Sequence, residues 1–388
     1  MFEEGGWMEG FTFHRSDLAT FYWEGLQAHG IRNFRSGLFL TAPRRTGKST
    51  FLREDFIPHI QKNGGLPVIV DLWEKPDVDM VTLLTEALVR ELDLHAGFLS
   101  RAAKKTGMSK INLTGRHDAA EFNTTQQESA ENSLMILVTK LRVKSGKPVA
   151  LIIDEAQHAL QTEAGRNGMF ALKAARDALN LGSKETGLFL VFTGSNRDKL
   201  AELVTRKSQP FFGSAIEKFP LLDNNFVSSY AEHMKRVSGV KDFDVPILVR
   251  AFDWLGKKPD TFFRVVNEAI TANSQDKNGA LMILAKKEVE LSVKETHARV
   301  AALPETQRIV LETLLNAGRD FAPFSADTLA KYESRKDGRR MTVPAIQKAL
   351  DALREKGFLW RGSYGDYAID DDALLDWHKT SRSQHTRS

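Results

Sequence analysis

A short basic stretch has the residue types and spacing needed to hold a phosphate group. It reads Ala42-Pro43-Arg44-Arg45-Thr46-Gly47-Lys48-Ser49-Thr50 and matches the pattern GxxxxGK[ST], with alanine at the first glycine position. In this pattern backbone N–H groups surround the phosphates, the lysine reaches the β and γ oxygens, and the serine ligates magnesium. We therefore expect residues 43–50 to bind ATP, Lys48 to be catalytic as well, and Ser49 to be a magnesium ligand.

The residues on either side of this loop favour a phosphate site over an unrelated basic turn. Residues 37–41 (GLFLT) form an apolar run typical of a buried strand, and a helical pattern follows over residues 49–60. A helix that begins at a loop directs its backbone N–H groups and the positive end of its dipole at a bound anion. Gly47 permits the backbone conformation that the loop requires. The sequence predicts a strand–loop–helix unit that positions Lys48 and Ser49.

Two adjacent carboxylates, Asp154 and Glu155, follow a second apolar run at residues 148–153. Magnesium needs a fixed carboxylate, and hydrolysis needs a second one that orients or deprotonates water. We expect Asp154 to hold magnesium through its water shell and Glu155 to polarise the attacking water. Taken alone, an acidic pair at a strand end is typical of a helix cap. The phosphate loop earlier in the chain and the strands on both sides favour the catalytic interpretation.

Residues in three other places could complete this chemistry. The next apolar run, residues 188–193, is followed by Gly194-Ser195-Asn196, where we expect Asn196 or Ser195 to hold the attacking water or to sense the γ-phosphate. Arg206 is a candidate arginine finger for a neighbouring subunit. Arg264 is a candidate for an arginine that reports the nucleotide state to a lid. A simple turn and solvated or ion-paired arginines are the alternatives.

A parallel sheet must place these groups. Four apolar runs, at residues 37–41, 67–72, 148–153 and 188–193, are continuous rather than alternating, as strands buried on both faces require. Helical patterns lie between them, and the polar residues 101–130 predict an insertion or flexible connection before a helix at 132–143. The predicted fold class is therefore α/β, with a parallel-sheet P-loop core at about residues 10–222.

Strand signals stop at about residue 224, and two further domains are predicted. Residues 223–300 predict a helical lid, in which a helix over residues 261–272 is capped by Asp260 or Thr261. Residues 301–380 predict helices at 305–316, 325–333 and 343–356, then a β-hairpin within 358–369. Three helices followed by a hairpin are the winged form of helix-turn-helix. Residues 381–388 form a polar tail.

The composition excludes several other kinds of chemistry. The chain has no cysteine, which excludes disulfides, cysteine zinc sites and thiol catalysis and favours a reducing compartment. No apolar run approaches the roughly 18 residues that a membrane span needs, and the first residues lack the order of a signal peptide. The histidines have no metal-ligand spacing, so we assign no transition metal. We expect a cytoplasmic protein without a membrane partner.

The overall charge does not demand a polyanionic partner. The formal net charge is +4, from 54 basic and 50 acidic residues. Any basic binding surface must therefore be local, and the candidate clusters lie at residues 335–340 and 101–105, although such clusters are commonly solvated loops. Near the start, Phe11, Phe13, Phe21, Tyr22 and Trp23 predict packing around an N-terminal helix, and some of them could flank a base.

Together these motifs resemble those of the AAA+ and STAND P-loop ATPases, particularly a prokaryotic group with a PRRTGKS-type loop, a DEAQ-type acidic motif and a C-terminal winged helix. The matching residues are 43–49, Asp154-Glu155-Ala156-Gln157, Thr193-Gly194-Ser195-Asn196 and residues 208–213 (SQPFFG). The resemblance implies a sheet in which the strand before Gly194 lies between the other two motif strands, followed by a helical lid and a winged helix. It also implies ATP and Mg²⁺ as cofactors and a homo-oligomer.

This chain departs from the pattern of these families in two places. A Gly-Asn-Pro turn in the lid is matched only loosely by Gly256-Lys257-Lys258-Pro259, which bears on Arg264. An arginine soon after the Phe-Gly element is not matched, since Ser214 and Ala215 follow Gly213. Arg206 is therefore the substitute candidate for the finger.

Two hypotheses concern what hydrolysis controls. In the first, nucleotide state controls assembly on double-stranded DNA or loading of a partner, with residues 342–356 in the major groove and Gln347, Lys348, Lys336, Arg339 and Arg340 on or near the backbone. The near balance of charge after residue 300 weighs against it. In the second, the chain is a signalling switch that oligomerises around an effector protein, such as a toxin or anti-phage protein, and its winged helix docks protein. A threading unfoldase is disfavoured because no aromatic-glycine pore motif is present between the second strand and the acidic strand.

Overall fold

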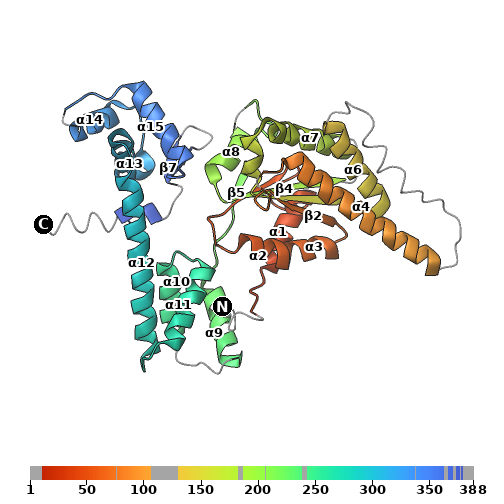
Figure 1. Ribbon diagram of the computed structural model, residues 1–388, viewed down its shortest axis with the longest axis horizontal. Helices are drawn as coiled ribbons and strands as arrows, with labels where there is room; N and C mark the ends of the chain where they lie inside the picture. Colours follow the sequence, from red (N-terminus) through yellow and green to blue (C-terminus); the bar gives the residue numbers. More distant parts are fainter. Residues whose placement is uncertain are drawn as a thin grey trace.

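The structure is a computed structural model that describes residues 11–75, 77–105, 130–181, 187–205, 207–237, 243–336, 338–361, 366–369, 373–375 and 377–378. Figure 1 shows three bodies along the chain. We call them the sheet unit (residues 16–218), the helical unit (residues 224–301) and the C-terminal unit (residues 305–369). Among the described helices, none combines the length and the apolar character that crossing a bilayer requires.

The sheet unit contains five parallel strands in the order β2-β3-β4-β1-β5. They are β1 (Leu38–Thr41), β2 (Leu66–Asp71), β3 (Val149–Asp154), β4 (Leu188–Gly194) and β5 (Ile216–Lys218). The first four are the strands that the sequence predicts, and the parallel sheet confirms the α/β fold class. The sequence does not predict β5, because a three-residue edge strand reading Ile-Glu-Lys lacks a continuous apolar run.

The strand order brings the three motif strands together. Strand β4 lies between β3, which ends at Asp154, and β1, which leads into the phosphate loop, so the order expected from the resemblance is confirmed. Thr41 is in register with Gly194, and Asp71 with Asp154. Because the strands are parallel, their carboxyl ends meet at one edge of the sheet. The loop, the acidic pair and residues 193–196 are therefore neighbours in space.

Helices cover both faces of the sheet (Figure 1). Alternate residues of β3 point to opposite sides, with Leu151 in one hydrophobic core and Ile152 in the other. One face packs against α1 (Ser16–Gln27), α2 (Lys48–Phe51), η1 (Leu52–Phe56) and α3 (Ile57–Lys62). The other packs against α4 (Met80–Lys105), α6 (Ala130–Ser145), the 3-10 helix η2 (Ala156–Gln161), α7 (Glu163–Asn180) and α8 (Arg197–Thr205).

Two local predictions in the sheet unit need correction. The insertion predicted at residues 101–130 begins later, because α4 continues to Lys105, while residues 106–129 lie outside the described residues. The single helix predicted over residues 49–60 is divided into α2, a π-helical turn (η1) and α3. Pro58 explains the division, since it has no N–H to donate to the carbonyl four residues earlier and a wider turn accommodates it.

The helical unit is built from α9 (Asn224–Val237), α10 (Val245–Trp254), α11 (Pro259–Thr271) and α12 (Lys277–Ala301) around a core rich in phenylalanine. The cap predicted at Asp260 or Thr261 is wrong, because α11 begins at Pro259 with Lys258 in the N-cap position. Proline favours the first helical position, since its fixed φ suits the helix and its missing N–H would have no partner there. The start of α11 therefore lies two residues earlier than the pattern predicts.

The C-terminal unit has the predicted three helices and hairpin. They are α13 (Glu305–Ala317), the short 3-10 helix η3 (Gly318–Asp320), α14 (Ala326–Arg335), α15 (Val343–Glu355) and the antiparallel pair β6 (Leu359–Arg361) and β7 (Tyr367–Ile369). Its core is separate, and α12 runs from the helical unit to it (Figure 1). The C-terminal end of α15 contacts α8 of the sheet unit, where Arg354 Nη2 lies 2.9 Å from Asp198 Oδ2.

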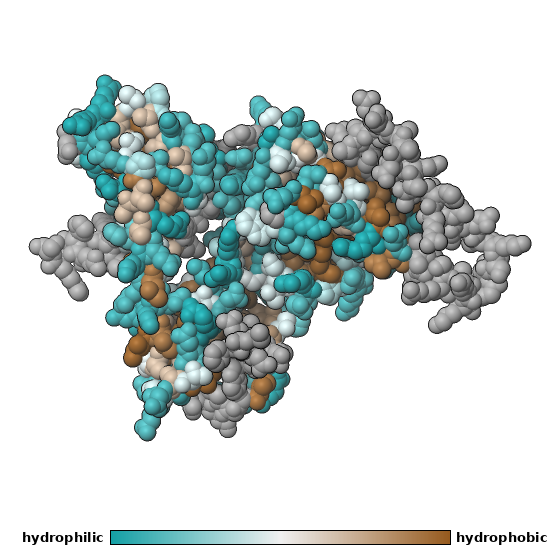
Figure 2. All heavy atoms as spheres, in the orientation of Figure 1, coloured by the Kyte–Doolittle hydropathy of each residue, from teal (hydrophilic) through white to brown (hydrophobic). Residues whose placement is uncertain are grey.

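The surface seen in Figure 2 is largely hydrophilic, as expected for units that each have an internal core. Hydrophobic residues gather over the region of α4, where Val89 and Leu94 are exposed. The polar motif residues instead converge at the carboxyl edge of the sheet. That edge is therefore the candidate functional site.

Candidate functional site

The loop between β1 and α2 has the backbone conformation that the motif requires. Gly47 has φ +88° and Arg45 has φ +63°, both in the left-handed region that L side chains rarely adopt. The Thr46 hydroxyl donates to the Pro43 carbonyl at 2.7 Å, which closes the turn. The N–H of Ala42 donates to the Gly194 carbonyl at 3.2 Å, so the first residue of the motif is attached to β4. Alanine in place of glycine is buried there and leaves the loop intact.

A pocket of about 570 Å³ opens between this loop and the helical unit. All eight predicted cofactor residues of the loop line it: Pro43, Arg44, Arg45, Thr46, Gly47, Lys48, Ser49 and Thr50. The carboxylates at the sheet edge form one end of the pocket. Aromatic and aliphatic side chains from the N-terminal segment, the connection before α9 and the helical unit form the other: Phe11, Phe13, Leu222, Phe226 and Phe263. The pocket therefore has a charged end and an apolar end.

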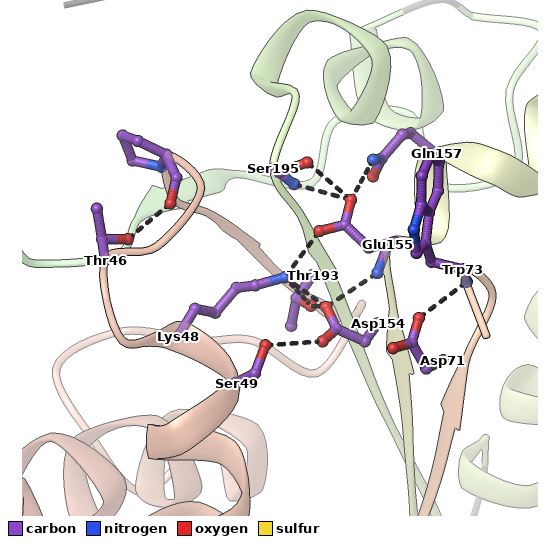
Figure 3. Close-up of polar contacts among 11 residues, drawn as sticks. Thr46, Lys48, Ser49, Asp71, Trp73, Asp154, Glu155, Gln157, Thr193 and Ser195 are labelled. Carbon is purple, nitrogen blue, oxygen red and sulfur yellow. Dashed lines mark hydrogen bonds and ion pairs between the residues drawn. The ribbon is translucent and has the colours of Figure 1, made fainter. Parts of the chain in front are cut away.

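Lys48 is the centre of the charged end (Figure 3). The residue is only 7% exposed, and its ammonium contacts Asp154 directly. The same nitrogen donates to Thr193 Oγ1 at 2.9 Å and lies 3.5 Å from Glu155 Oε1. A buried ammonium is costly unless it is paired and hydrogen-bonded, and here both carboxylates compensate it. The lysine is thus held at the sheet edge and faces the pocket.

Asp154 is oriented by three further donors. The Thr193 hydroxyl and the N–H of Glu155, at 2.9 Å, both donate to its Oδ1. Ser49 Oγ lies 3.4 Å from its Oδ2. Burial alone would raise the pKa of Asp154, but the Lys48 ammonium and the hydrogen bonds outweigh burial, so this pKa lies below its ordinary value. The carboxylate is therefore ionised at neutral pH.

The pair formed by Asp154 and Ser49 fits a magnesium ion. A carboxylate and a hydroxyl side by side are hard oxygen ligands, and magnesium is usually held by one or two such groups together with phosphate oxygens and water. The ammonium of Lys48 already shows that a cation is stable beside Asp154. The residues that the sequence predicts as metal ligands are thus adjacent in space.

Glu155 is held by side chains on both sides. Its backbone has φ +53°, a strained conformation for a non-glycine residue. Its Oε2 accepts hydrogen bonds from Ser195 Oγ at 2.8 Å, from Ser195 N at 3.3 Å and from Gln157 Nε2. Burial would raise the pKa of Glu155, but Lys48 and these hydrogen bonds lower it below its ordinary value. Glu155 is therefore an ionised, oriented carboxylate beside the lysine.

Gly194 permits this arrangement of Glu155. A Cβ atom at position 194 would lie 2.3 Å from Gln157 Oε1, a distance that side chains cannot tolerate. The glycine therefore leaves room for Gln157 to reach Glu155. Neither Gln157 nor Thr193 has a predicted catalytic role, and the only signal in the sequence is their place in the acidic motif and at the end of the third motif strand.

Asp71 is a third carboxylate that the sequence analysis misses. It ends β2, lines the pocket and is in register with Asp154. Burial raises the pKa of Asp71, and the negative charges of Asp154 and Glu155 raise it further, against a hydrogen bond from the N–H of Trp73. Trp73 in turn lies under the guanidinium of Arg44, 5.4 Å from the ring centroid, which fixes one arginine of the loop at the pocket.

Other predicted site residues lie apart from Glu155. Asn196 accepts a hydrogen bond from the N–H of Lys199 at 2.8 Å and caps α8, so Ser195 is the residue of this pair that contacts Glu155. Arg264 pairs with Glu268 at 3.0 Å and with Glu288 at 2.7 Å, and it does not line the pocket. Arg206 lies outside the described residues.

The apolar end of the pocket separates the N-terminal aromatic residues into two groups. Tyr22 and Trp23 are buried against the sheet, as predicted for helix packing. Phe11 and Phe13 instead contact Phe226 of α9, with ring centroids 6.0 and 5.7 Å apart, and line the pocket. Of the aromatic residues expected to flank a base, Phe11 and Phe13 are therefore the ones that lie at the pocket.

Comparison with known proteins gives a likeness in structure. No protein-family profile matches the chain, and no curated protein matches it in sequence. The structure is similar to the ADP form of the ORC2 protein of Aeropyrum pernix, with 13% identity, 98% of this chain and 97% of that chain covered, and a TM-score of 0.57. It is also similar to the ADPNP–ADP complexes of the same protein, with 13% identity, 96% and 94% covered, and a TM-score of 0.52. At this identity the likeness concerns the fold alone, which this chain shares with the ORC2 protein along nearly its whole length.

Proposed function

We propose that the pocket binds ATP with Mg²⁺ and hydrolyses the γ-phosphate. One observation carries the proposal: Lys48, at the end of a phosphate-binding loop, is buried against two ionised carboxylates and faces an open pocket. A purely structural ion pair would be enclosed. The ADP and ADPNP named for the Aeropyrum pernix ORC2 structures support a nucleotide as the ligand.

Each residue at the charged end has a role in this proposal. The loop N–H groups and Lys48 bind the phosphate oxygens and neutralise charge as it develops. Ser49 and Asp154 would hold Mg²⁺, which when bound would polarise the phosphate oxygens. Glu155 accepts a hydrogen bond from the attacking water, and its contacts with Ser195 and Gln157 fix its orientation. Asp71, whose pKa is raised, is a candidate second acceptor for that water.

Two arginines complete the proposal. Arg206 is proposed to stabilise the γ-phosphate of a neighbouring subunit, which requires a homo-oligomer. Arg264 can reach the nucleotide only after its ion pairs with Glu268 and Glu288 break. We therefore expect Arg264 to act only when the helical unit moves relative to the sheet unit.

We propose that nucleotide state controls assembly on DNA, with the C-terminal unit as a winged helix. Its exposed basic residues support this role: Arg339, Arg340 and Lys348 lie on α15 or just before it. Gln347, also expected near DNA, bonds to Asp351 at 3.1 Å, so it must release that partner to contact a phosphate or base. The side chains of residues 101–105, the other basic cluster, lie outside the described residues.

A signalling switch is the second candidate, and one observation favours it. The C-terminal unit already docks on α8 of its own chain through the pair of Arg354 and Asp198. A winged helix that docks on protein within its own chain could also dock an effector. In this function the chain would oligomerise on ATP binding without contacting DNA.

The experiment that tests these functions is the rate of ATP hydrolysis against protein concentration, with and without duplex DNA. Lys48→Ala serves as the blank. Stimulation by DNA that weakens as salt is raised supports the DNA function. A rate of hydrolysis per protein molecule that rises with protein concentration and does not change with DNA supports the switch. No hydrolysis above the blank under either condition contradicts the ATPase proposal.

The role of Arg206 has its own test. Arg206→Ala protein mixed with Glu155→Gln protein should hydrolyse ATP faster than either alone, because each variant supplies the group that the other lacks. A mixture no faster than its parents contradicts action on a neighbouring subunit.

A further inference from the structure

The start of α8 is a docking surface that holds the C-terminal unit. Asp198 is only 4% exposed there, and its carboxylate accepts hydrogen bonds from Arg354 and Arg361 of the C-terminal unit. Its Oδ1 accepts from Arg354 Nε at 3.0 Å and from the N–H of Arg361 at 2.7 Å. Its Oδ2 accepts from Arg354 Nη2 at 2.9 Å. Bidentate pairing of this kind fixes orientation as well as distance.

Neighbouring residues extend the contact to the hairpin. The guanidinium of Arg197 lies 3.8 Å from the ring centroid of Trp360 in β6. Arg354 also lies 3.8 Å from Glu202, one turn further along α8. Burial disfavours the charge of Arg354, yet the carboxylate of Asp198 outweighs it, so the pKa of Arg354 is raised. The end of α15 and the first strand of the hairpin thus both pack against α8.

The docking surface is continuous with the charged end of the pocket. Ser195, which donates to Glu155, is only three positions before Asp198, and Asn196 between them caps α8. A second cavity, of about 640 Å³, is lined on one side by Thr46, Ser195 and Asn196 and on another by Lys356 and Gly357. The phosphate loop, the Glu155 partner and the C-terminal unit therefore meet at one place.

We propose that Asp198 is a positioning residue, which ties the seating of the C-terminal unit to the position of Ser195 and thereby of Glu155. The inference rests on the proposed nucleotide site. A bound γ-phosphate and its attacking water would shift Glu155 and Ser195. The short segment from Ser195 to Asp198, which contains the cap of α8, would transmit that shift to Asp198. The coupling is reciprocal, because a change in seating caused by nucleotide requires that seating change the affinity or turnover of nucleotide.

The absence of cysteine from the chain allows a direct test of seating. Donor and acceptor dyes are attached at Ala174→Cys on α7 and Ala326→Cys on α14, both exposed positions. In the otherwise unchanged chain we expect one narrow distance distribution that shifts on addition of ADPNP and not of ADP. In Asp198→Asn we expect a broader distance distribution that does not shift on addition of ADPNP or of ADP. Glu86→Gln, which removes one member of the exposed pair with Lys75, is the matched control and should behave like the unchanged chain.

Kinetics distinguishes positioning from a structural role. Asp198→Asn and Arg354→Ala should lower kcat about tenfold, or roughly 1.4 kcal/mol, and leave the Kd for ADPNP within about twofold. Exchange of the two charges, in Asp198→Arg with Arg354→Asp, should recover part of kcat. Circular dichroism verifies that each variant is folded.

The outcomes are separable. Intact ADPNP binding with unchanged dye distance and unchanged kcat in Asp198→Asn would overturn the inference alone. A loss of kcat matched by loss of binding, without recovery on charge exchange, would also overturn it, because it indicates general damage. Failure of the unchanged chain to bind ADPNP would overturn the proposed function, and the coupling with it.

Discussion

Two buried ion pairs, Lys48 with Asp154 and Arg354 with Asp198, have similar chemistry and opposite surroundings. Asp198 is enclosed, and its bonds come from Arg354 and from the backbone of Arg361. Lys48 and Asp154 lie beside a pocket, with Glu155 and Ser49 close enough to exchange partners. The pair of Arg354 and Asp198 fixes two units against each other. The pair of Lys48 and Asp154 is arranged so that a ligand can replace some of its contacts.

Exposure to a pocket, rather than burial of charge, distinguishes the pair that we propose to be reactive. Burying charges costs free energy in both places, and in both places hydrogen bonds compensate that cost. Only at Lys48 do several donors and acceptors converge on space that a phosphate could fill. Changes at Lys48 should therefore weaken nucleotide binding directly, whereas changes at Arg354 should alter the seating of the C-terminal unit and reach turnover only through that seating.

The largest effect is expected from Lys48→Ala. It removes the group that meets the phosphates and leaves Asp154 without its partner, so the affinity for ATP should fall on the order of 1000-fold, roughly 4 kcal/mol. Titration with a fluorescent ATP analogue measures it. Lys75→Ala, on an exposed pair, is the control and should keep its affinity. Near-normal affinity in Lys48→Ala would remove the basis for calling this pair reactive.

Glu155→Gln should separate binding from hydrolysis. The amide keeps the size of the side chain but cannot act as a base, so kcat should fall by about 100-fold or more while ATP remains bound. Single-turnover hydrolysis and retention of labelled ATP on a filter measure the two quantities. Turnover retained in Glu155→Gln would contradict the role of Glu155.

Arg354→Ala should loosen the enclosed pair, whose two residues do not line the nucleotide pocket. Breaking a buried pair costs about 3 kcal/mol, because the remaining charge has no partner. The N–H of Arg361 donates to Asp198, so its hydrogen exchange should accelerate about 100-fold, on the order of that free energy. Mass spectrometry of the peptide containing Arg361 reports this rate. Unchanged exchange would mean that Arg354 does not hold the hairpin.

Thr193→Val should have a smaller effect at the pocket. Valine keeps the shape of threonine and removes the hydroxyl that bonds to Asp154 and Lys48. Losing a neutral hydroxyl that bonds to two charged groups should cost about 1 to 2 kcal/mol in magnesium-dependent ATP affinity. Calorimetry with ATP and Mg²⁺ measures it. A Thr193→Ser variant, which keeps the hydroxyl, should lose much less.

The smallest effect is expected from pH. The pKa values of Asp154 and Glu155 lie below their ordinary values of 3.8 and 4.5, so the stabilisation they provide is present above about pH 4.5. It is lost as the pH falls through the lowered folded-state values. Asp71 has a raised pKa and acts in the opposite sense, since its ionisation opposes folding as the pH rises. Urea unfolding between pH 3 and 7 should therefore vary less with pH in Asp154→Asn than in the unchanged chain.

Much of the sheet unit could be predicted because its local signals agree with its tertiary environment. Strands β1, β3 and β4 are buried along their whole length, since both faces are covered, and β2 is apolar as far as Val70. The loop after β1 has a strongly specified pattern. Edge strand β5, the π-helical turn before Pro58 and the start of α11 at Pro259 depend on pairing or on single backbone constraints. Periodicity does not report such features.

The candidate site divides in the same way. The sequence by itself determined Lys48, Ser49, Asp154 and Glu155, because phosphate and metal chemistry restricts which residue types can follow each strand. Only the tertiary structure placed Thr193 and Gln157 around the carboxylates, attached Ser195 rather than Asn196 to Glu155, and closed Arg264 in ion pairs. It also brought Arg354 to Asp198, 156 positions earlier in the chain. The physical reason is that residue type fixes what a side chain can do, whereas its partners depend on strand order and packing between units distant in sequence.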